Sequence, residues 1–270
     1  MSLFKSLYFS LFVIFGLICN LAVARENVLE NKKNQEVMQK YYNKASNGDY
    51  HAMYSIGVVY NLGLLGVKQD YQQAMFWYVW AEMGGNTFAM VSIGELYQKG
   101  LAIRQDYQQA IQWYLRAADM GNSIAMANIA YLYQKGLGVK QDSQQAMQWY
   151  LKAANKGNPF AMHDIGVVYA KGLGVKQDNQ KAMEWYLKAV DKGVPRSMYN
   201  IGYLYANGLG VKQDYQQAMQ WWLKAANKNI PNAMVAIGVL YQEGLGVEKD
   251  PIQAEQWFKK AKEVEEKLKK

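Results

Sequence analysis

The sequence predicts an all-α fold, a solenoid of six tandem repeats that each form an antiparallel pair of helices. Three observations support this prediction: a dipeptide that recurs with a fixed period, apolar residues at helical spacing within each copy, and Gly and Asp residues that mark helix ends. The dipeptide is Ala-Met or Ser-Met, and it starts at Ala52, Ala89, Ala125, Ala161, Ser197 and Ala233. The last five starts are 36 residues apart, and the first precedes the second by 37. A single copy cannot bury its own apolar face, so successive copies are expected to stack.

The first helix of each repeat carries one apolar face. In the third copy, Met126, Ile129, Ala130 and Tyr133 lie at i, i+3, i+4 and i+7. The position of Ala130 is Gly in the other five copies. Glycine inside a helix costs about 1 kcal/mol relative to alanine, so its use here predicts that a neighbouring helix approaches closely. Gly136 is expected to end the helix in the left-handed conformation.

The second helix is predicted to begin after an aspartate. In the third copy, Asp142 is the expected N-cap, with Gln145 completing an arrangement like a capping box. In the sixth copy, Pro251 follows the capping Asp250 at the first helical position, where proline is favoured. One tryptophan recurs in each of these helices, at Trp77, Trp113, Trp149, Trp185, Trp221 and Trp257. Their strict register favours core packing over a sugar or cofactor site.

The first 24 residues predict a cleavable signal peptide. Lys5 precedes a mostly apolar run over residues 7–18, and Ala22-Val23-Ala24 supplies the small residues that signal peptidase reads. The run is shorter than the roughly 20 residues that span a membrane, and an uncleaved anchor is the alternative. The only cysteine, Cys19, lies inside this segment, so the exported chain is expected to have no thiol for a disulfide, a metal site or a nucleophile.

The remaining chain divides into three predicted parts. Residues 25–51 match the second half of a repeat, residues 52–261 hold the six full copies, and residues 262–270 extend the last helix. In that last helix, Val264 and Leu268 continue the apolar stripe while Lys and Glu fill the other positions. We expect this extension to cap the stack with a polar outer face. No segment after the signal is apolar enough to predict a transmembrane helix.

Charge and composition exclude several classes of function. The formal charge is +8, and removing the signal with its single Lys leaves +7. These charges are spread over the repeats without a run of five or six, which favours a solvated face over nucleic-acid binding. The chain has two histidines, no His/Glu set with metal-ligand spacing and no serine in a nucleophile elbow. We therefore predict no catalytic residue, no metal and no cofactor.

The repeat as a whole resembles the Sel1-like repeat, a relative of the tetratricopeptide repeat. The residues that carry the resemblance are Ala-x-x-x-Ile-Gly-x-Leu-Tyr, then Gly-x-Gly-Val-x-x-Asp, then Ala-x-x-Trp-Tyr-x-Lys-Ala-Ala-x-x-Gly, over residues 52 to about 261. Ala102, Val190 and Trp222 depart from this pattern. The resemblance implies a right-handed superhelix with a concave groove lined by the first helices, and function through protein–protein contact. One cysteine-rich branch of the family is linked to penicillin binding and β-lactam hydrolysis, and this chain lacks that branch's paired cysteines.

Binding specificity is expected on the first helices, at positions opposite the apolar stripe. These positions are unusually apolar and aromatic, and aromatic side chains suit the recognition of a peptide or loop. The candidate groove residues are Tyr54, Phe88, Glu95, Tyr131, Phe160, His163, Tyr199 and Tyr203. The alternative is that many of them pack against the adjacent repeat. His163 is interpreted as a plain helix-surface residue rather than a catalytic one.

The sequence thus predicts a non-enzymatic scaffold or adaptor, exported to the bacterial periplasm, that binds a protein or peptide partner. A secreted factor that acts on a host surface is the alternative. An enzyme active on β-lactams or peptidoglycan is the third and weakest interpretation.

Overall fold

The computed structural model describes residues 30–269, and the predicted signal peptide lies outside them. Every regular element in this range is a helix, so the prediction of an all-α repeat solenoid is confirmed. The chain divides into two compact units, Met1–Trp113 and Tyr114–Lys270, which we call unit 1 and unit 2. None of the described helices is long and apolar enough to cross a membrane.

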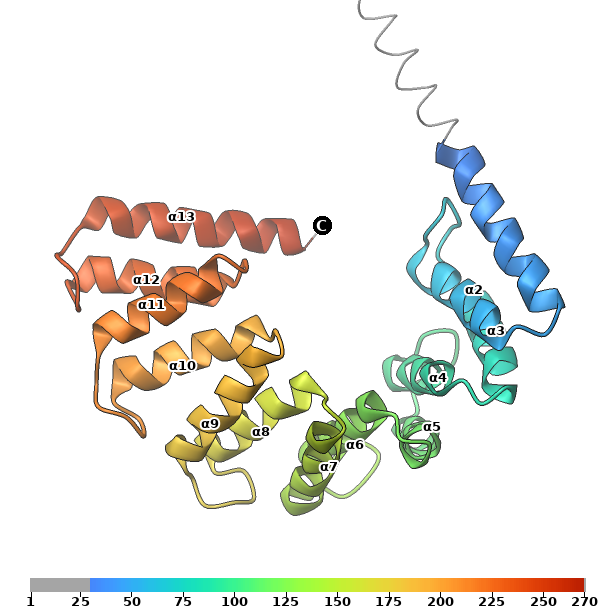
Figure 1. The fold of residues 1–270 in the computed structure, drawn as a ribbon, viewed down its shortest axis with the longest axis horizontal. Helices are drawn as coiled ribbons and strands as arrows, with labels where there is room; N and C mark the ends of the chain where they lie inside the picture. Colours follow the sequence, from blue (N-terminus) through green and yellow to red (C-terminus); the bar gives the residue numbers. More distant parts are fainter. Residues whose placement is uncertain (1–29, 270) are drawn as a thin grey trace, which may run out of the picture. The chain divides into compact units, whose positions relative to one another are not determined.

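Unit 1 begins, in its described part, with a helix over residues 30–46. The next helices are α2 (Tyr50–Leu62), α3 (Tyr71–Met83) and α4 (Thr87–Lys99), and α5 (Tyr107–Asp119) crosses into unit 2. The helix over residues 30–46 contributes Met38 and Ala45 to the buried core of α2 and α3. In the first repeat, α2 packs most extensively against α3 (Figure 1).

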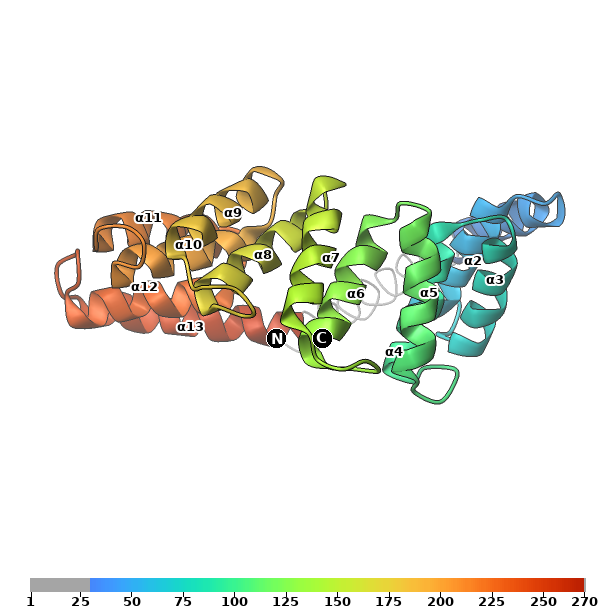
Figure 2. The ribbon, with the colours of Figure 1, turned by 90° about the horizontal axis from the view of Figure 1, so that it is seen from below.

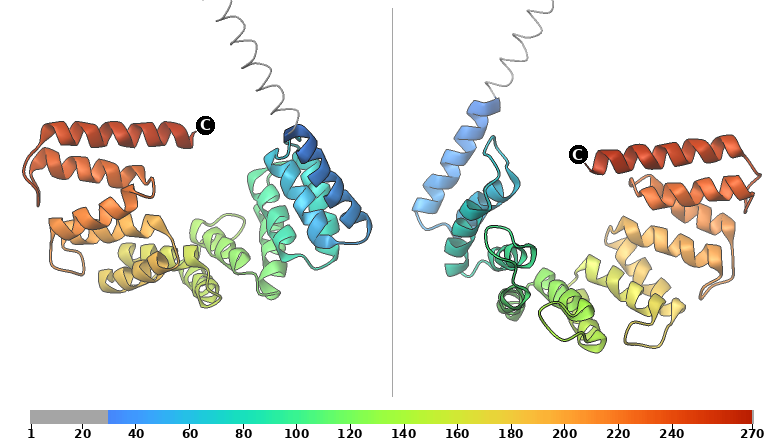
Figure 3. Two further views of the ribbon diagram at one scale, coloured as in Figure 1. Left: turned by 45° about the horizontal axis from the view of Figure 1, so that its top comes forward. Right: turned by 180° about the vertical axis from the view of Figure 1, so that it is seen from behind.

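Unit 2 continues the alternation of first and second helices (Figures 1 and 2). Its helices are α6 (Ser123–Lys135), α7 (Ser143–Asn155), α8 (Pro159–Lys171), α9 (Asn179–Asp191), α10 (Pro195–Asn207), α11 (Tyr215–Ala226), α12 (Pro231–Glu243) and α13 (Pro251–Leu268). Each first helix packs most extensively against the second helix of its own repeat, and each second helix packs less extensively against the next first helix. The final pair, α12 and α13, lies side by side in all views (Figure 3).

In four first helices the mid-helix glycine, Gly57, Gly166, Gly202 or Gly238, meets an aromatic ring of the second helix, as its use predicts. The third copy has Ala130 at this position. A Cβ atom at Gly166 would lie 2.5 Å from the Tyr186 ring, and one at Gly202 would lie 2.5 Å from the Trp222 ring. These contacts leave no room for a side chain on the first helix. The rings belong to the residue that follows the recurring tryptophan, and Tyr78, Tyr114 and Tyr150 at this position are among the most buried side chains.

The recurring tryptophans are less buried than core packing predicts. Trp77, Trp221 and Trp257 contact the cores of their units but remain partly exposed. A lysine three residues later covers the outer ring face in four copies, with Nζ 4.0 Å from the ring centroid of Trp149, 4.1 Å from that of Trp185, 4.2 Å from that of Trp221 and 4.8 Å from that of Trp257. The tryptophan therefore closes the edge of the core beneath a cation–π contact.

The loop between the helices begins at a left-handed glycine and ends at a capping aspartate. Gly136 ends α6 at φ 68°, as predicted. Asp142 Oδ1 accepts from the N–H groups of Gln144 and Gln145, both at 2.9 Å. The Asp142 N–H donates to the Tyr133 carbonyl at 3.0 Å, whereas in a capping box it would donate to the Gln145 side chain. The expected capping-box arrangement is therefore wrong for this cap.

A glutamine before the capping Asp joins the loop to the end of the first helix. Gln141 Nε2 donates to the Gln134 carbonyl at 2.9 Å, and Gln177 Nε2 donates to the Ala170 carbonyl at 2.9 Å. Carbonyl groups in the last turn of a helix have no partner inside the helix, so this side chain satisfies one of them. The loop is therefore part of the packed repeat.

Candidate functional site

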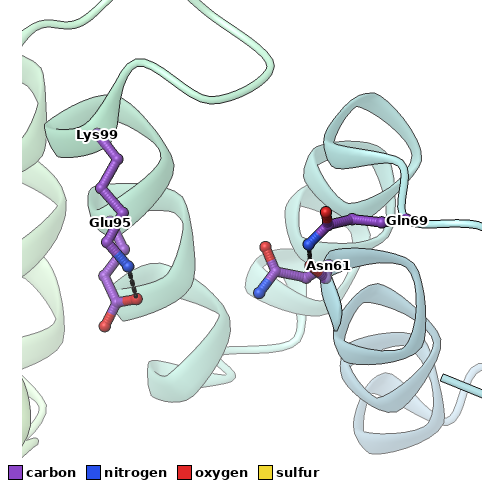
Figure 4. Close-up of polar contacts among 4 residues, drawn as sticks. All are labelled: Asn61, Gln69, Glu95 and Lys99. Atoms are coloured by element: carbon purple, nitrogen blue, oxygen red, sulfur yellow. Dashed lines mark hydrogen bonds and ion pairs between the residues drawn. The ribbon is translucent and has the colours of Figure 1, made fainter. Parts of the chain in front are cut away.

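The candidate residues of unit 1 form one aromatic contact and one ion pair. The Tyr54 ring on α2 lies 6.1 Å from that of Phe88 on α4, between centroids, and Phe88 is 50% exposed. Burial raises the pKa of Tyr54, which keeps this hydroxyl protonated. Glu95 on α4 lies 3.4 Å from Lys99 Nζ, facing Asn61 of α2 across a small cavity (Figure 4). Unit 1 therefore presents an aromatic pair and a charged pair on its first helices.

The candidate residues of unit 2 differ in exposure. Phe160 on α8 is 67% exposed, and Tyr131 on α6 is also exposed. Tyr199 on α10 is half-buried, because its ring stacks at 6.4 Å on Trp222, whose Nε1 donates to the Tyr199 carbonyl at 3.0 Å. Phe160 and Tyr131 are thus free to contact a partner, whereas Tyr199 is held in place by its own repeat.

His163 lies partly buried between two repeats, so its interpretation as a plain helix-surface residue is wrong. Its Nδ1 lies 2.8 Å from Ser197 Oγ, and its ring lies 5.6 Å from that of Tyr186. Ser197 stands where the five other copies have a buried alanine, and it supplies the polar partner that a buried imidazole needs. Ser197 is 0% exposed, which excludes it as a nucleophile for an external substrate.

The groups around His163 have shifted titration behaviour. Burial, together with the charge of nearby Arg196, lowers the pKa of His163 to about 4. Burial raises the pKa of Asp164 to about 6, and Arg196 opposes that shift. The imidazole is therefore neutral at pH 7, and its role is to join α8 to α10.

A cavity of about 500 Å³ lies beside this contact, between α8 and α10. Three tyrosines line it: Tyr186, Tyr199 and Tyr203. Tyr203 is 49% exposed and forms the open side. Of the eight candidate residues, Tyr199 and Tyr203 are the two that line this cavity.

Sequence analysis missed an apolar patch on the outer face of α3. The α3 patch, as we call it, lies on one face of the helix and consists of four side chains that are 42% to 65% exposed: Phe76, Val79, Trp80 and Met83. The other five copies have Gln or Glu at the position of Phe76 and Lys or Arg at that of Trp80. A comparison of the second helices at these two positions shows this difference directly.

The described residues contain no group of three or more His, Cys, Asp or Glu side chains that could hold a metal ion. What the geometry offers is exposed aromatic side chains on repeated helices and an open cavity lined by three tyrosines.

Six consecutive copies of the Sel1 repeat match the chain, over residues 51–81, 87–122, 123–158, 159–194, 195–230 and 231–263. The protein belongs to the Sel1 repeat family. The six copies agree in number with the predicted repeats, and the family resemblance is confirmed. Sel1 repeats generally mediate protein–protein interaction, on a scaffold that is generally non-catalytic.

Two solved Sel1 structures are similar over most of the chain. A Sel1 repeat protein from Oxalobacter formigenes has 33% sequence identity and a TM-score of 0.79, covering 86% of this chain and 95% of that one. The protective antigen c5321 of uropathogenic Escherichia coli has 33% identity and a TM-score of 0.73, covering 84% of this chain and 48% of the antigen.

A plant relative is similar over a shorter stretch. The ERAD-associated E3 ubiquitin-protein ligase component HRD3A of Arabidopsis thaliana is 37% identical over 57 residues, which are 21% of this chain and 8% of HRD3A. The Sel1 chain thus spans about half of the E. coli antigen and a small part of HRD3A.

Proposed function

We propose that this Sel1 repeat protein is an exported scaffold of the bacterial envelope that binds a peptide or protein partner through its first helices. The observation that carries the proposal is the exposure of Phe88, Tyr131, Phe160 and Tyr203 at positions that the repeat's own packing leaves uncovered. Burying such rings against a partner supplies large contact area at low entropic cost. The signal-like residues 1–24 support export.

A secreted factor that contacts a host is the second candidate. It is favoured by the likeness to c5321, which is described as a protective antigen of uropathogenic strains. Cell fractionation distinguishes the two candidates, since the first expects the protein in the periplasmic fraction and the second in the culture medium. Retention in the cytoplasm would contradict both.

Site-specific crosslinking in the producing cells tests the binding surface. A photoreactive phenylalanine analogue at Phe160 is expected to capture a discrete partner band, because this side chain is the most exposed of the candidate residues. The same analogue at Gln148, an exposed position on the second helix α7, is the matched control and is expected to capture none.

A double variant then tests the aromatic residues themselves. Tyr131→Ala with Tyr203→Ala is expected to reduce partner capture while the helical circular dichroism is retained, because both side chains are exposed. If the fold survives and capture is unchanged, the first helices are not the binding surface.

A further inference from the structure

The α3 patch replaces a polar stripe that the second helices of the other copies carry. Phe76, Trp80 and Met83 lie at i, i+4 and i+7, on one face of the helix. In the other five copies these positions hold Gln or Glu, then Lys or Arg, then Asp, Asn or Glu. The packing of the repeat therefore does not require apolar side chains here. A contiguous group of exposed apolar side chains is typical of an interaction surface.

The part of the chain around the α3 patch carries no net charge. Residues 30–113 contain seven Lys and Arg and seven Asp and Glu, so the +7 that remains after removal of the predicted signal lies entirely in residues 114–270. Two copies can therefore approach each other through unit 1 without the repulsion that unit 2 would impose. An anionic lipid surface, in contrast, would attract unit 2.

The row of cations on the second helices is also interrupted beside the patch. The position that is Lys or Arg in the later copies is Trp80 in α3 and Asn43 in the helix over residues 30–46. These two helices are neighbours, since the Tyr42 ring lies 5.6 Å from the Trp77 ring, between centroids. Asn43 Oδ1 accepts from Gln39 Nε2 at 2.9 Å, so a neutral pair occupies this row next to α3. A second copy that meets the patch does not bring two rows of cations together.

The spacing of the patch is self-complementary about a two-fold axis. We consider two α3 helices that pack antiparallel, with the axis between residues 79 and 80. Phe76 of one copy then lies opposite Met83 of the other, and Val79 lies opposite Trp80 in the same way. Each pairing places an aromatic ring against an aliphatic or thioether side chain, which is a favourable contact. Glu82, the only charged residue of α3, has no like charge of the other α3 opposite it.

We propose that the α3 patch is the contact surface of a weak, two-fold symmetric dimer of this chain. Its four side chains expose roughly 400 Å² of apolar area, since one aromatic side chain buries about 150 to 250 Å² in full. One partner in a stable complex of standard size buries about 800 Å². We therefore expect a dissociation constant of about 10 to 100 µM, with monomers and an exposed patch near 1 µM. The inference does not rest on the proposed partner binding, because the patch lies on a second helix.

Sedimentation velocity of the chain from residue 25 onward tests the dimer, and its starting point excludes the predicted signal as the occupant of the patch. The weight-average mass is expected to rise from monomer at about 1 µM toward dimer at about 300 µM. Phe76→Gln with Trp80→Lys should remain monomeric throughout while its helical circular dichroism is retained. A monomer at every concentration of the unmodified protein would overturn the inference.

The matched control changes the same kinds of residue outside the patch. Gln148→Lys with Ile252→Gln adds one positive charge on α7 and removes one exposed apolar side chain from α13. This variant should dimerise like the unmodified protein. Equal loss of the dimer in both double variants would show that the contact lies elsewhere, and would contradict the proposal.

Cysteine crosslinking tests the antiparallel pairing without depending on a variant that disrupts the patch. The chain from residue 25 onward has no cysteine, so each single substitution introduces the only thiol. Phe76→Cys protein mixed with Met83→Cys protein should form a disulfide-linked dimer about tenfold faster than either protein alone, because these positions face each other across the axis. Faster crosslinking within either single protein would contradict this arrangement.

Vesicles of phosphatidylglycerol and phosphatidylethanolamine test the other candidate occupant, a lipid surface. Phe76→Gln with Trp80→Lys adds a positive charge, so vesicle binding driven by charge should be retained or increased in this variant. Loss of vesicle binding in the variant, together with an unmodified protein that stays monomeric, would assign the patch to lipid and overturn the dimer. Partner capture at Phe160 is measured separately, so failure of the dimer leaves the scaffold function standing.

Discussion

At the residue scale, the contact between the fourth and fifth copies has residues of its own. Ser197 replaces the alanine of the other five copies, Asn179 replaces the tyrosine of three of them, and His163 stands at a position that varies between copies. Each of the three lies where α8 or α9 meets α10 or the loop after it. Regular positions of a solenoid specify stacking, so local departures from the pattern are where new chemistry can arise. Here they produce one polar contact and one cavity, side by side.

The His163 contact predicts an unusual dependence of stability on pH. The pKa of His163 is lowered in the folded state, so its contribution is present above pH 6.5 and is lost as the pH falls toward 4. The pKa of Asp164 is raised, so the folded protein binds more protons than the unfolded chain between about pH 3.8 and 6. Over that range the two effects on the free energy of unfolding oppose each other.

Asp164→Asn should remove the Asp164 contribution to this pH dependence. We expect the variant to lose more stability than the unmodified protein as the pH falls from 6 to 4, because only the His163 effect remains. Urea unfolding at several pH values measures it. A pH profile parallel to that of the unmodified protein would contradict the assignment of these two groups.

At the element scale, each second helix begins at an aspartate whose side chain and backbone N–H bond to different helices. The carboxylate accepts from N–H groups of the first turn, while the N–H of the same residue donates to a tyrosine carbonyl of the preceding helix, from Asp70 to Asp250 in all six copies. The capping residue therefore starts one helix and closes the loop from the other.

A pair of substitutions distinguishes this arrangement from a capping box. Asp142→Ala should lower the free energy of unfolding by about 1 kcal/mol, because two N–H groups lose their acceptor. Gln145→Ala should change it by less than about 0.5 kcal/mol, since its side chain lies on an exposed surface and the Asp142 N–H is already bonded. Chemical denaturation measures both changes in the free energy of unfolding. Equal losses in the two variants would favour a capping box.

The α3 patch gives a second prediction at this scale. Phe76→Gln with Trp80→Lys introduces the residues found in other copies, so the fold and melting temperature should change little. Binding of a hydrophobic dye should fall, because these rings are exposed. Ile252→Gln, which alters an exposed apolar residue on α13, is the control and should have a smaller effect. Unchanged dye binding in the double variant would show that the patch is covered.

At the scale of the whole molecule, stability is a sum over neighbouring helix pairs. The most extensive packing contacts join consecutive helices, and the ring that meets Gly57 comes from Tyr78 of the same repeat. A chain built this way lacks one central core whose loss unfolds everything at once. Copies should therefore be removable in whole units.

Deletion of residues 123–158, one complete Sel1 copy, should yield a folded protein with a lower melting temperature. Deletion of residues 141–158, one second helix with its cap, should leave the apolar face of α6 without its partner and abolish cooperative unfolding. Circular dichroism during heating compares the two. Equal behaviour of both variants would contradict the modular account.

Helix identity, caps and turns were predictable because they depend on residues close together in the chain. Gly136 has the positive φ angle expected of it, 68°. Burial was less predictable, since it depends on which helix lies opposite. The tryptophans were expected in the core, and the adjacent Tyr150 is the more buried ring. His163 was expected at the surface, and its contact with Ser197 could not be predicted because the two residues are 34 positions apart in the sequence.

The sequence by itself determined the all-α repeat architecture, since the period, the helix ends and the mid-helix glycines are local or periodic signals. The tertiary structure decided which variable side chains are available. It left Phe160 exposed, buried part of His163 and opened a cavity at Asn179. The physical reason is that a departure from the repeat pattern acquires meaning only from the neighbouring copy that packs against it, and a single residue does not specify that contact.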